Sequence, residues 1–146
     1  MLQVSVYRYN PETDREPSMQ DLQVDTGGKD LMVLDVLELL KAQDPSLTYR
    51  RSCREGVCGS DGLNMNGKNG LACITPLSAT VKNDRLVIRP LPGLPVVRDL
   101  VVDMTPFWTK IRAVKPWLQP AGPPPEREYL ASRESMIELA EVMNCI

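Results

Sequence analysis

The feature that most constrains this 146-residue chain is a glycine-rich segment that carries two of its four cysteines close together. The segment reads CREGVCGSDG from residue 53 to residue 62, and Cys73 follows soon after it. Glycine has no β-carbon, so Gly56, Gly59 and Gly62 allow the backbone to wrap closely round a bound group. The chain has no histidine, which removes the usual general base and the commonest metal ligand. We therefore do not expect hydrolytic catalysis.

The charge balance excludes some partners. The chain has 17 basic and 19 acidic residues, with a formal net charge of -2 and no long block of either sign. This pattern does not favour a nucleic-acid partner. No stretch approaches the ~18 apolar residues of a membrane-spanning helix, and the first residues do not resemble a secretion signal. We expect a soluble or peripheral protein whose cysteines are reduced thiols or metal ligands.

Period-2 alternation of apolar and polar residues predicts strands at residues 2–9 and 19–25, joined by a hairpin loop. Apolar residues then recur at helical spacing, which predicts a helix that begins at Asp30 as the N-cap and ends at Pro45.

Two Asn-Gly pairs between residues 66 and 70 predict a hairpin that folds residues 71–73 back toward the cysteine segment. A further strand is predicted at residues 86–88. Together these elements predict an α+β fold, in which one helix crosses a small β-grasp-like sheet.

The composition changes after residue 103. A Thr-Pro pair and an apolar stripe predict a helix over residues 105–114, and the prolines from residue 116 to 125 predict an extended linker. A last helix is predicted over residues 132–143. We therefore predict one domain over residues 1–103 and the start of a second, helical unit over residues 104–146.

The cysteine spacing is typical of one cofactor. Plant-type ferredoxins hold a two-iron, two-sulfide (2Fe-2S) cluster with a C-x4-C-x2-C motif and a distant fourth cysteine. Here Cys53, Cys58 and Cys73 are cysteines, and Asp61 stands at the third position. A carboxylate can bind iron, although it is a harder ligand than a thiolate. The spacing predicts Asp61 as the fourth ligand, with Ser60 or solvent as the alternative and a turn-capping aspartate as the other interpretation.

Other interpretations of the cysteines are weaker. A structural zinc site could use the same three cysteines, but such sites favour C-x2-C pairs and a fourth Cys or His. A Cys53–Cys58 disulfide would not suit a reducing compartment. Three neighbouring arginines, Arg50, Arg51 and Arg54, form either a docking or potential-tuning patch or a solvated face, and the sequence leaves both open.

The chain also resembles a known family, namely the N-terminal portion of the iron-sulfur subunit of succinate dehydrogenase. The resemblance rests on RSCREGVCGSDG at 51–62, NMNG at 64–67, LAC at 71–73, RPLPGLP at 89–95 and VRDLVVDM at 97–104. The aspartate at the third ligand position resembles the pattern of succinate dehydrogenase rather than that of its close relative, fumarate reductase.

The resemblance implies a relay subunit that carries electrons and performs no acid–base chemistry. Such a subunit takes electrons from the FAD of a flavoprotein subunit that oxidises succinate to fumarate. It passes them through the 2Fe-2S cluster toward quinone at membrane anchor subunits. The implied location is peripheral, on the cytoplasmic side of the bacterial inner membrane. Family members continue into a helical ferredoxin domain with a 4Fe-4S and a 3Fe-4S cluster, and Cys145 resembles the first ligand of that domain.

The sequence ends one residue after Cys145, so it lacks the other ligands of those two clusters. One cysteine cannot hold a four-iron cluster. We therefore expect the 2Fe-2S cluster alone from these residues, and no quinone reductase activity without further chains. The sequence leaves three explanations open for the missing ligands: it is a fragment, it comes from a split gene, or a second chain supplies the remainder. The alternatives are a fumarate reductase iron-sulfur subunit, a stand-alone ferredoxin-like carrier and an inactive fragment.

Overall fold

The computed structural model describes residues 1–117, 119, 122–123, 126 and 130–143. The chain divides into two compact units, Met1–Lys110 and Ile111–Ile146. All of the strands in the described part lie in the first unit. The predicted division after residue 103 stays a prediction.

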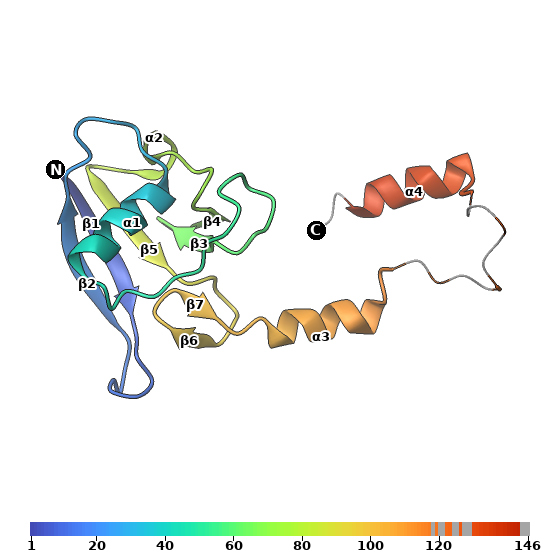
Figure 1. Ribbon diagram of the computed structural model, residues 1–146, viewed down its shortest axis with the longest axis horizontal. Coiled ribbons are helices and arrows are strands. Elements are labelled where there is room, and N and C mark those ends of the chain that lie inside the picture. The colour runs from blue at the N-terminus through green and yellow to red at the C-terminus, as the bar shows by residue number, and fades with distance from the viewer. Residues whose placement is uncertain (118, 120–121, 124–125, 127–129, 144–146) are drawn as a thin grey trace. The chain divides into compact units, whose positions relative to one another are not determined.

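The first unit is built on a mixed sheet of five strands (Figure 1). Its order is β2-β1-β5-β3-β4, from β1 (Leu2–Arg8), β2 (Ser18–Val24), β3 (Gly62–Met65), β4 (Lys68–Leu71) and β5 (Arg85–Arg89). Strand β1 pairs antiparallel with β2 and parallel with β5, and β3 pairs antiparallel with both β4 and β5. A second sheet holds β6 (Val96–Arg98) and β7 (Val101–Val102). The strands predicted at 2–9, 19–25 and 86–88 are confirmed.

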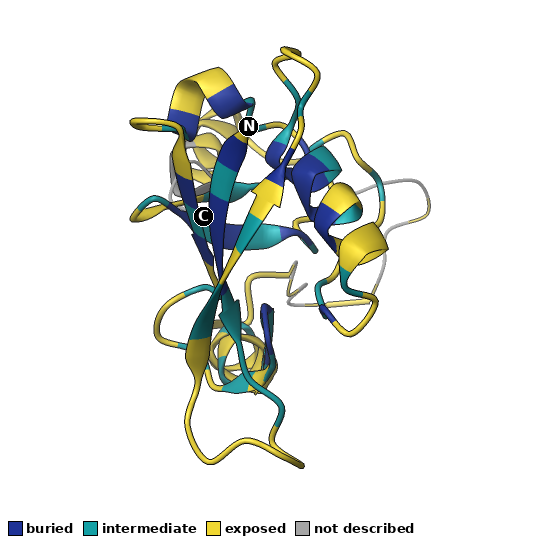
Figure 2. Ribbon diagram, turned by 90° about the vertical axis from the view of Figure 1, so that its left-hand side faces the viewer, coloured by how far each residue is buried: buried dark blue, intermediate teal, exposed yellow. Residues whose placement is uncertain are grey.

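Helix α1 (Val33–Gln43) crosses one face of the sheet and forms the core with it. Five of its residues are buried, and they share one stripe: Val33, Leu34, Val36, Leu37 and Leu40. They belong to the same cluster as the strand residues Val4, Val6, Leu86 and Ile88. Figure 2 shows the buried residues concentrated on the strands and on the helix. Each fully buried aliphatic side chain of this kind contributes about 1.5–3 kcal/mol, so α1 is a firmly held support.

The predicted N-cap of α1 is wrong. The cap is Met32, whose amide donates to Asp35 Oδ2 at 3.2 Å. Asp30 instead accepts hydrogen bonds from the amide and hydroxyl of Ser78, at the start of α2 (Leu77–Thr80). The sequence pattern failed here because the first free amides of the helix find distant partners. Val33 N donates to the carbonyl of Thr75, and Leu34 N donates to the carbonyl of Ala72.

A tight hairpin precedes Cys73. Asn66 (φ 48°) and Gly67 (φ 86°) both have positive φ, as a two-residue turn between antiparallel strands requires. Met65 therefore pairs with Lys68, and the returning strand ends at Leu71. Cys73 lies in the turn that follows this strand. The predicted hairpin is confirmed, and its turn is shorter than the five residues from 66 to 70 that carry the Asn-Gly pairs.

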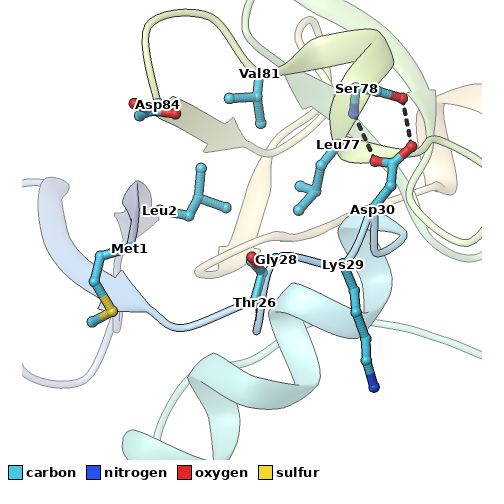
Figure 3. Close-up of a pocket in the computed structure, with 10 residues that line it drawn as sticks. All are labelled: Met1, Leu2, Thr26, Gly28, Lys29, Asp30, Leu77, Ser78, Val81 and Asp84. Atoms are coloured by element: carbon cyan, nitrogen blue, oxygen red, sulfur yellow. Dashed lines mark hydrogen bonds between the residues drawn. The ribbon is translucent and has the colours of Figure 1, made fainter.

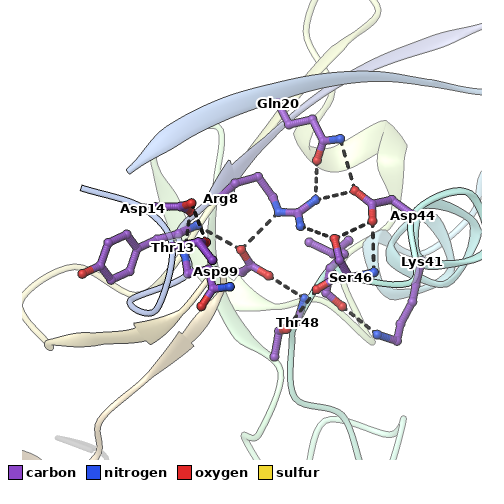
Figure 4. Close-up of polar contacts among 12 residues, drawn as sticks. Arg8, Thr13, Asp14, Gln20, Lys41, Asp44, Ser46, Thr48 and Asp99 are labelled. Atoms are coloured by element: carbon purple, nitrogen blue, oxygen red, sulfur yellow. Dashed lines mark hydrogen bonds and ion pairs between the residues drawn. The ribbon is translucent and has the colours of Figure 1, made fainter. Parts of the chain in front are cut away.

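An ion-pair network joins the segments round Asp44 and Asp99 to strand β1 of the sheet (Figure 4). Arg8 on β1 lies between two carboxylates, with Nη1 2.7 Å from Asp44 Oδ2 and Nε 3.1 Å from Asp99 Oδ1. Asp99 is 2% exposed and also accepts from the amides of Tyr9 (3.0 Å) and Thr48 (2.8 Å). These donors satisfy both oxygens of a buried carboxylate, which would otherwise be costly to bury. The network fixes the segment around Asp99 against β1 and the chain that leaves α1.

The C-terminal helices are exposed. Helix α3 (Thr105–Val114) buries none of its residues, and Phe107 and Trp108 meet edge to face with their ring centres 5.2 Å apart. Helix α4 (Arg133–Met143) carries exposed Met136 and Ile137. The helices predicted at 105–114 and 132–143 are confirmed. In the part of the chain that the structure describes, no helix is both long enough and apolar enough to cross a membrane.

We expect Asp99→Asn to lower the free energy of unfolding by about 2–4 kcal/mol. Asparagine tolerates the positive φ of 45° at this position, so the loss would report the charge and the acceptor rather than the backbone. The measurement is denaturant unfolding near neutral pH. Asp21→Asn, on the exposed face of β2, is the matched control. Equal losses in the two variants would contradict the proposed weight of this network.

Candidate metal centre

The cysteine loop, which we define as residues 49–62, links the chain after α1 to strand β3. Three of its residues have left-handed backbone angles, namely Arg54 (φ 63°), Gly56 (φ 78°) and Gly59 (φ 69°). These turns coil the chain round the sulfur of Cys53, so that the amides of Glu55 and Cys58 point at it, 3.5 and 3.3 Å from Sγ. Amide hydrogen bonds to a sulfur stabilise negative charge on it, as in iron-sulfur proteins.

Cys58 is exposed and lies 3.2 Å, sulfur to oxygen, from the hydroxyl of Ser60. The hydrogen bond with the Ser60 side chain, followed by backbone hydrogen bonds, lowers the pKa of the Cys58 thiol to about 6. The thiolate, which is the form that binds metals, is therefore favoured near neutral pH.

Cys73 lies beside Asp61, although the two are separated by the whole β3–β4 hairpin. The amide of Cys73 donates to Asp61 Oδ2 at 2.5 Å, and the amide of Ala72 donates to the Asp61 carbonyl at 3.1 Å. Burial raises the pKa of the Cys73 thiol, and the neighbouring Asp61 carboxylate raises it further. The prediction that the hairpin returns Cys73 to the loop is confirmed by this contact.

The second oxygen of Asp61 is the most informative atom of the site. Asp61 is only 3% exposed, and its Oδ1 is buried without a hydrogen-bond partner among the described residues. A buried, unpaired carboxylate oxygen is costly, and native proteins rarely leave one without a role. An exposed turn-capping carboxylate such as Asp25 uses one oxygen in the turn and can leave the other to water, whereas the second oxygen of Asp61 is buried. The orphaned Oδ1, beside a cysteine and in a loop of amide donors, fits an iron-binding oxygen.

The sulfur donors suit a cluster rather than a single ion. Cys53, Cys58 and Cys73 are free thiols in the structure. Over the described residues, no three His, Cys, Asp or Glu side chains lie close enough together to hold one metal ion. A 2Fe-2S cluster does not require such a group, because each of its irons takes two protein ligands and is completed by the bridging sulfides. Three thiolates and one carboxylate would supply the four ligands that such a cluster needs.

The three arginines of the loop all have partners. The Nη1 of Arg50 donates to the carbonyl of Val102 at 2.9 Å, which ties the loop to β7. Arg51 and Arg54 both approach the carboxylate of Glu38 on α1. All three arginines are also exposed, so the structure leaves both interpretations of this face open, a docking or potential-tuning patch and a solvated surface.

The surface round the ligand candidates is apolar in two places. Val57, at the tip of the loop, is 80% exposed, and Ile74, directly after Cys73, is 54% exposed. A cavity of about 250 Å³ lies on another side of the loop, and its lining includes Cys58, Leu91 and Trp108. Exposed apolar side chains next to a redox site are typical of a surface that contacts another protein.

A separate cavity of about 430 Å³ lies next to the N-terminus, where the Asp30–Ser78 hydrogen bonds cross one side of it (Figure 3). Its lining contains no cysteine. Sequence reasoning did not find it, since its walls come from three separate stretches of chain.

Comparison with known proteins identifies the family. Residues 3–109, more than half of the chain, match the family model described as a 2Fe-2S iron-sulfur cluster binding domain. The chain belongs to this family. Its residues 3–109 therefore form a 2Fe-2S domain, and the predicted cofactor and the predicted α+β, ferredoxin-like fold are confirmed.

Two relatives of this chain are succinate dehydrogenase iron-sulfur subunits. The chain is 48% identical to the succinate dehydrogenase iron-sulfur subunit of Coxiella burnetii (strain RSA 493 / Nine Mile phase I), over 97% of this chain and 60% of the relative. It is 43% identical to the mitochondrial succinate dehydrogenase [ubiquinone] iron-sulfur subunit of Dictyostelium discoideum, over 97% of this chain and 50% of that protein. The chain thus spans about half to three-fifths of the length of these relatives.

A solved structure agrees with the sequence relatives. A chain of the Mycobacterium smegmatis Sdh1 complex in the apo form superimposes with a TM-score of 0.77 at 29% identity. The match covers 99% of this chain and 59% of that chain. The predicted resemblance to succinate dehydrogenase iron-sulfur subunits is confirmed. Which residues bind the cluster stays a prediction, and Cys145 lies outside the described residues.

Gly56 and Gly28 form a matched pair that tests whether the loop is shaped for the cluster. Both have left-handed φ (78° and 73°), but a β-carbon on Gly56 would lie 3.0 Å from the Ile74 side chain, whereas nothing lies within 4 Å of one on Gly28. We expect Gly56→Ala and Gly28→Ala each to cost roughly 1–2 kcal/mol of stability. Only Gly56→Ala should also lower the iron content per chain. Equal iron content in the two variants would contradict this account of the loop.

Proposed function

We propose that this chain is the 2Fe-2S part of a succinate dehydrogenase iron-sulfur subunit, with Cys53, Cys58, Asp61 and Cys73 as the cluster ligands. The observation that carries the proposal is the buried Asp61 carboxylate, which gives one oxygen to the Cys73 amide and leaves the other without a donor. The loop supplies thiol, carboxylate and amide groups, which suit the binding of a redox cofactor. In this proposal the chain acts as an electron relay within an oxidoreductase.

Each part of the site has a distinct task in that relay. A bound 2Fe-2S cluster accepts and releases single electrons. The amides of Glu55 and Cys58 stabilise negative charge at the Cys53 sulfur, and the depressed pKa of Cys58 prepares a thiolate for iron. Burial of Cys73 and Asp61 keeps water from the inner side of the site.

The names of the relatives support a place for this chain in a multi-subunit complex. We propose that the electrons come from the FAD of a flavoprotein subunit that oxidises succinate. They would leave toward quinone at membrane anchor subunits, through further clusters carried by residues that this sequence does not contain. The complex would lie on the cytoplasmic side of the bacterial inner membrane, with this chain as a peripheral subunit. The exposed Val57, at the tip of the loop, would contact the flavoprotein.

Substitutions at Asp61 test the ligand assignment. Asp61→Cys should keep two irons per chain and change the g values of the reduced cluster in electron paramagnetic resonance, because a thiolate replaces a carboxylate at one iron. Asp61→Ala should either lose iron or change those g values. Ser60→Ala is the control for the alternative ligand and should leave the g values unchanged. An Asp61→Ala protein with an unchanged spectrum would exclude Asp61 as a ligand.

Substitution of Val57 tests the electron donor. Succinate, added to the flavoprotein subunit and this chain together, should reduce the cluster, which succinate alone should not do. Val57→Asp should weaken the reaction about tenfold, since a charge in the core of a docking surface costs upward of 1.4 kcal/mol. Val97→Asp, at an exposed position on β6, should react at the normal rate. No reduction of the wild-type cluster by succinate and flavoprotein would exclude this donor.

A further inference from the structure

One carboxylate oxygen on helix α1 gathers three donors from the cysteine loop. Glu38 Oε1 accepts a hydrogen bond from the Tyr49 hydroxyl at 2.7 Å and lies 2.7 Å from Arg51 Nε. Arg54 Nη2 lies 3.8 Å from the same oxygen. The three donors come from both sides of Cys53 in the sequence. Glu38 is thus the one acidic residue of the described chain that pairs with side chains on both flanks of a predicted ligand.

The support behind Glu38 is rigid. Its neighbours on α1, Val36, Leu37 and Leu40, are fully buried in the core between the helix and the sheet. The loop residue Arg54 has a left-handed backbone (φ 63°), which is unfavourable for a residue other than glycine and needs support from its surroundings. The contact with Glu38 supplies such support from a fixed element.

The contact of Glu38 with Arg51 and Arg54 also determines where these two positive charges lie. Arg51 and Arg54 have side chains about half exposed, so without Glu38 they would be free to extend into water. Arg51 and Arg54 flank Cys53 in the sequence, and their two positive charges outweigh the single negative charge of Glu38. A net positive charge favours the reduced, more negative state of a cluster.

We propose that Glu38 is a positioning residue for the cluster, which anchors the Cys53 side of the loop to α1 and keeps Arg51 and Arg54 close enough to raise the reduction potential. This inference rests on the proposed function, because it requires a cluster in the loop. It goes further by assigning a role to a residue that is not a ligand.

The sign of the potential shift separates this role from a simple charge effect. If Glu38→Gln only removed a negative charge, the potential would rise. If it also releases the two arginines, the net loss is of positive charge and the potential falls. We therefore expect a lower potential in Glu38→Gln, in the same direction as in Arg51→Gln. Glu55→Gln removes the same charge within the loop, from a side chain with no contact recorded in the structure, and should raise the potential.

The experiment compares the wild-type 146-residue chain with Glu38→Gln, Glu55→Gln, Arg51→Gln and the double variant Glu38→Gln/Arg51→Gln. Potentials are measured by redox titration followed by electron paramagnetic resonance, at low ionic strength, because salt screens exposed charges. The rate of iron loss to a chelator is the second readout and should increase several-fold in Glu38→Gln. Glu16→Gln, in the exposed β1–β2 loop, should match the wild type in both readouts.

The double variant tests whether the two residues act through each other. Its potential should equal that of the single Arg51→Gln or Glu38→Gln variant within error, since the second substitution removes a contact already lost. A higher potential in Glu38→Gln, or iron loss no faster than in Glu16→Gln, would overturn this inference. The proposed function would still stand in that case, provided that the wild-type chain binds a cluster. A wild-type chain that binds no cluster would overturn both.

Discussion

The hydrogen bond from the Cys73 amide to the buried Asp61 carboxylate holds the cysteine loop against the β3–β4 hairpin, and the candidate site depends on it. Together with the bond from the Ala72 amide to the Asp61 carbonyl, this contact fixes Cys73 relative to the loop. The bond also fixes the carboxylate so that Oδ1 has no donor of its own. On the proposed assignment, this one side chain both closes the site and supplies an oxygen ligand, at the position where plant-type ferredoxins have a cysteine.

The rest of the 2Fe-2S domain supports that loop from two directions. The β3–β4 hairpin is part of the main sheet, and its far end leads directly into the turn that holds Cys73. On the other side, α1 is packed on the sheet and gives Glu38 to the residues round Cys53. The Arg8–Asp99 network then fixes the chain near β7, to which Arg50 of the loop is bonded. The loop thus carries the irregular backbone, and regular elements hold it in place.

The sequence was most reliable where one stretch of chain determines the outcome. The alternation in β1, the apolar stripe of α1 and the Asn66-Gly67 turn are local patterns, and each predicted its element. It failed where distant residues decide. Asp30 looks like an N-cap but binds Ser78, because Thr75 and Ala72 already satisfy the first amides of the helix. The cysteine spacing indicated the cofactor, yet no local pattern could pair Glu38 with Arg51 or leave Asp61 Oδ1 without a donor.

The most direct measurement is anaerobic reconstitution of this 146-residue chain, followed by counts of iron and sulfide and low-temperature electron paramagnetic resonance after reduction. The structure predicts about two irons and two sulfides per chain, as the 2Fe-2S stoichiometry requires, with a rhombic spin-one-half signal. Zinc in place of iron, or a chain that binds neither iron nor sulfide, would contradict the account, because the loop would then be unable to hold the cluster on which the proposed relay depends.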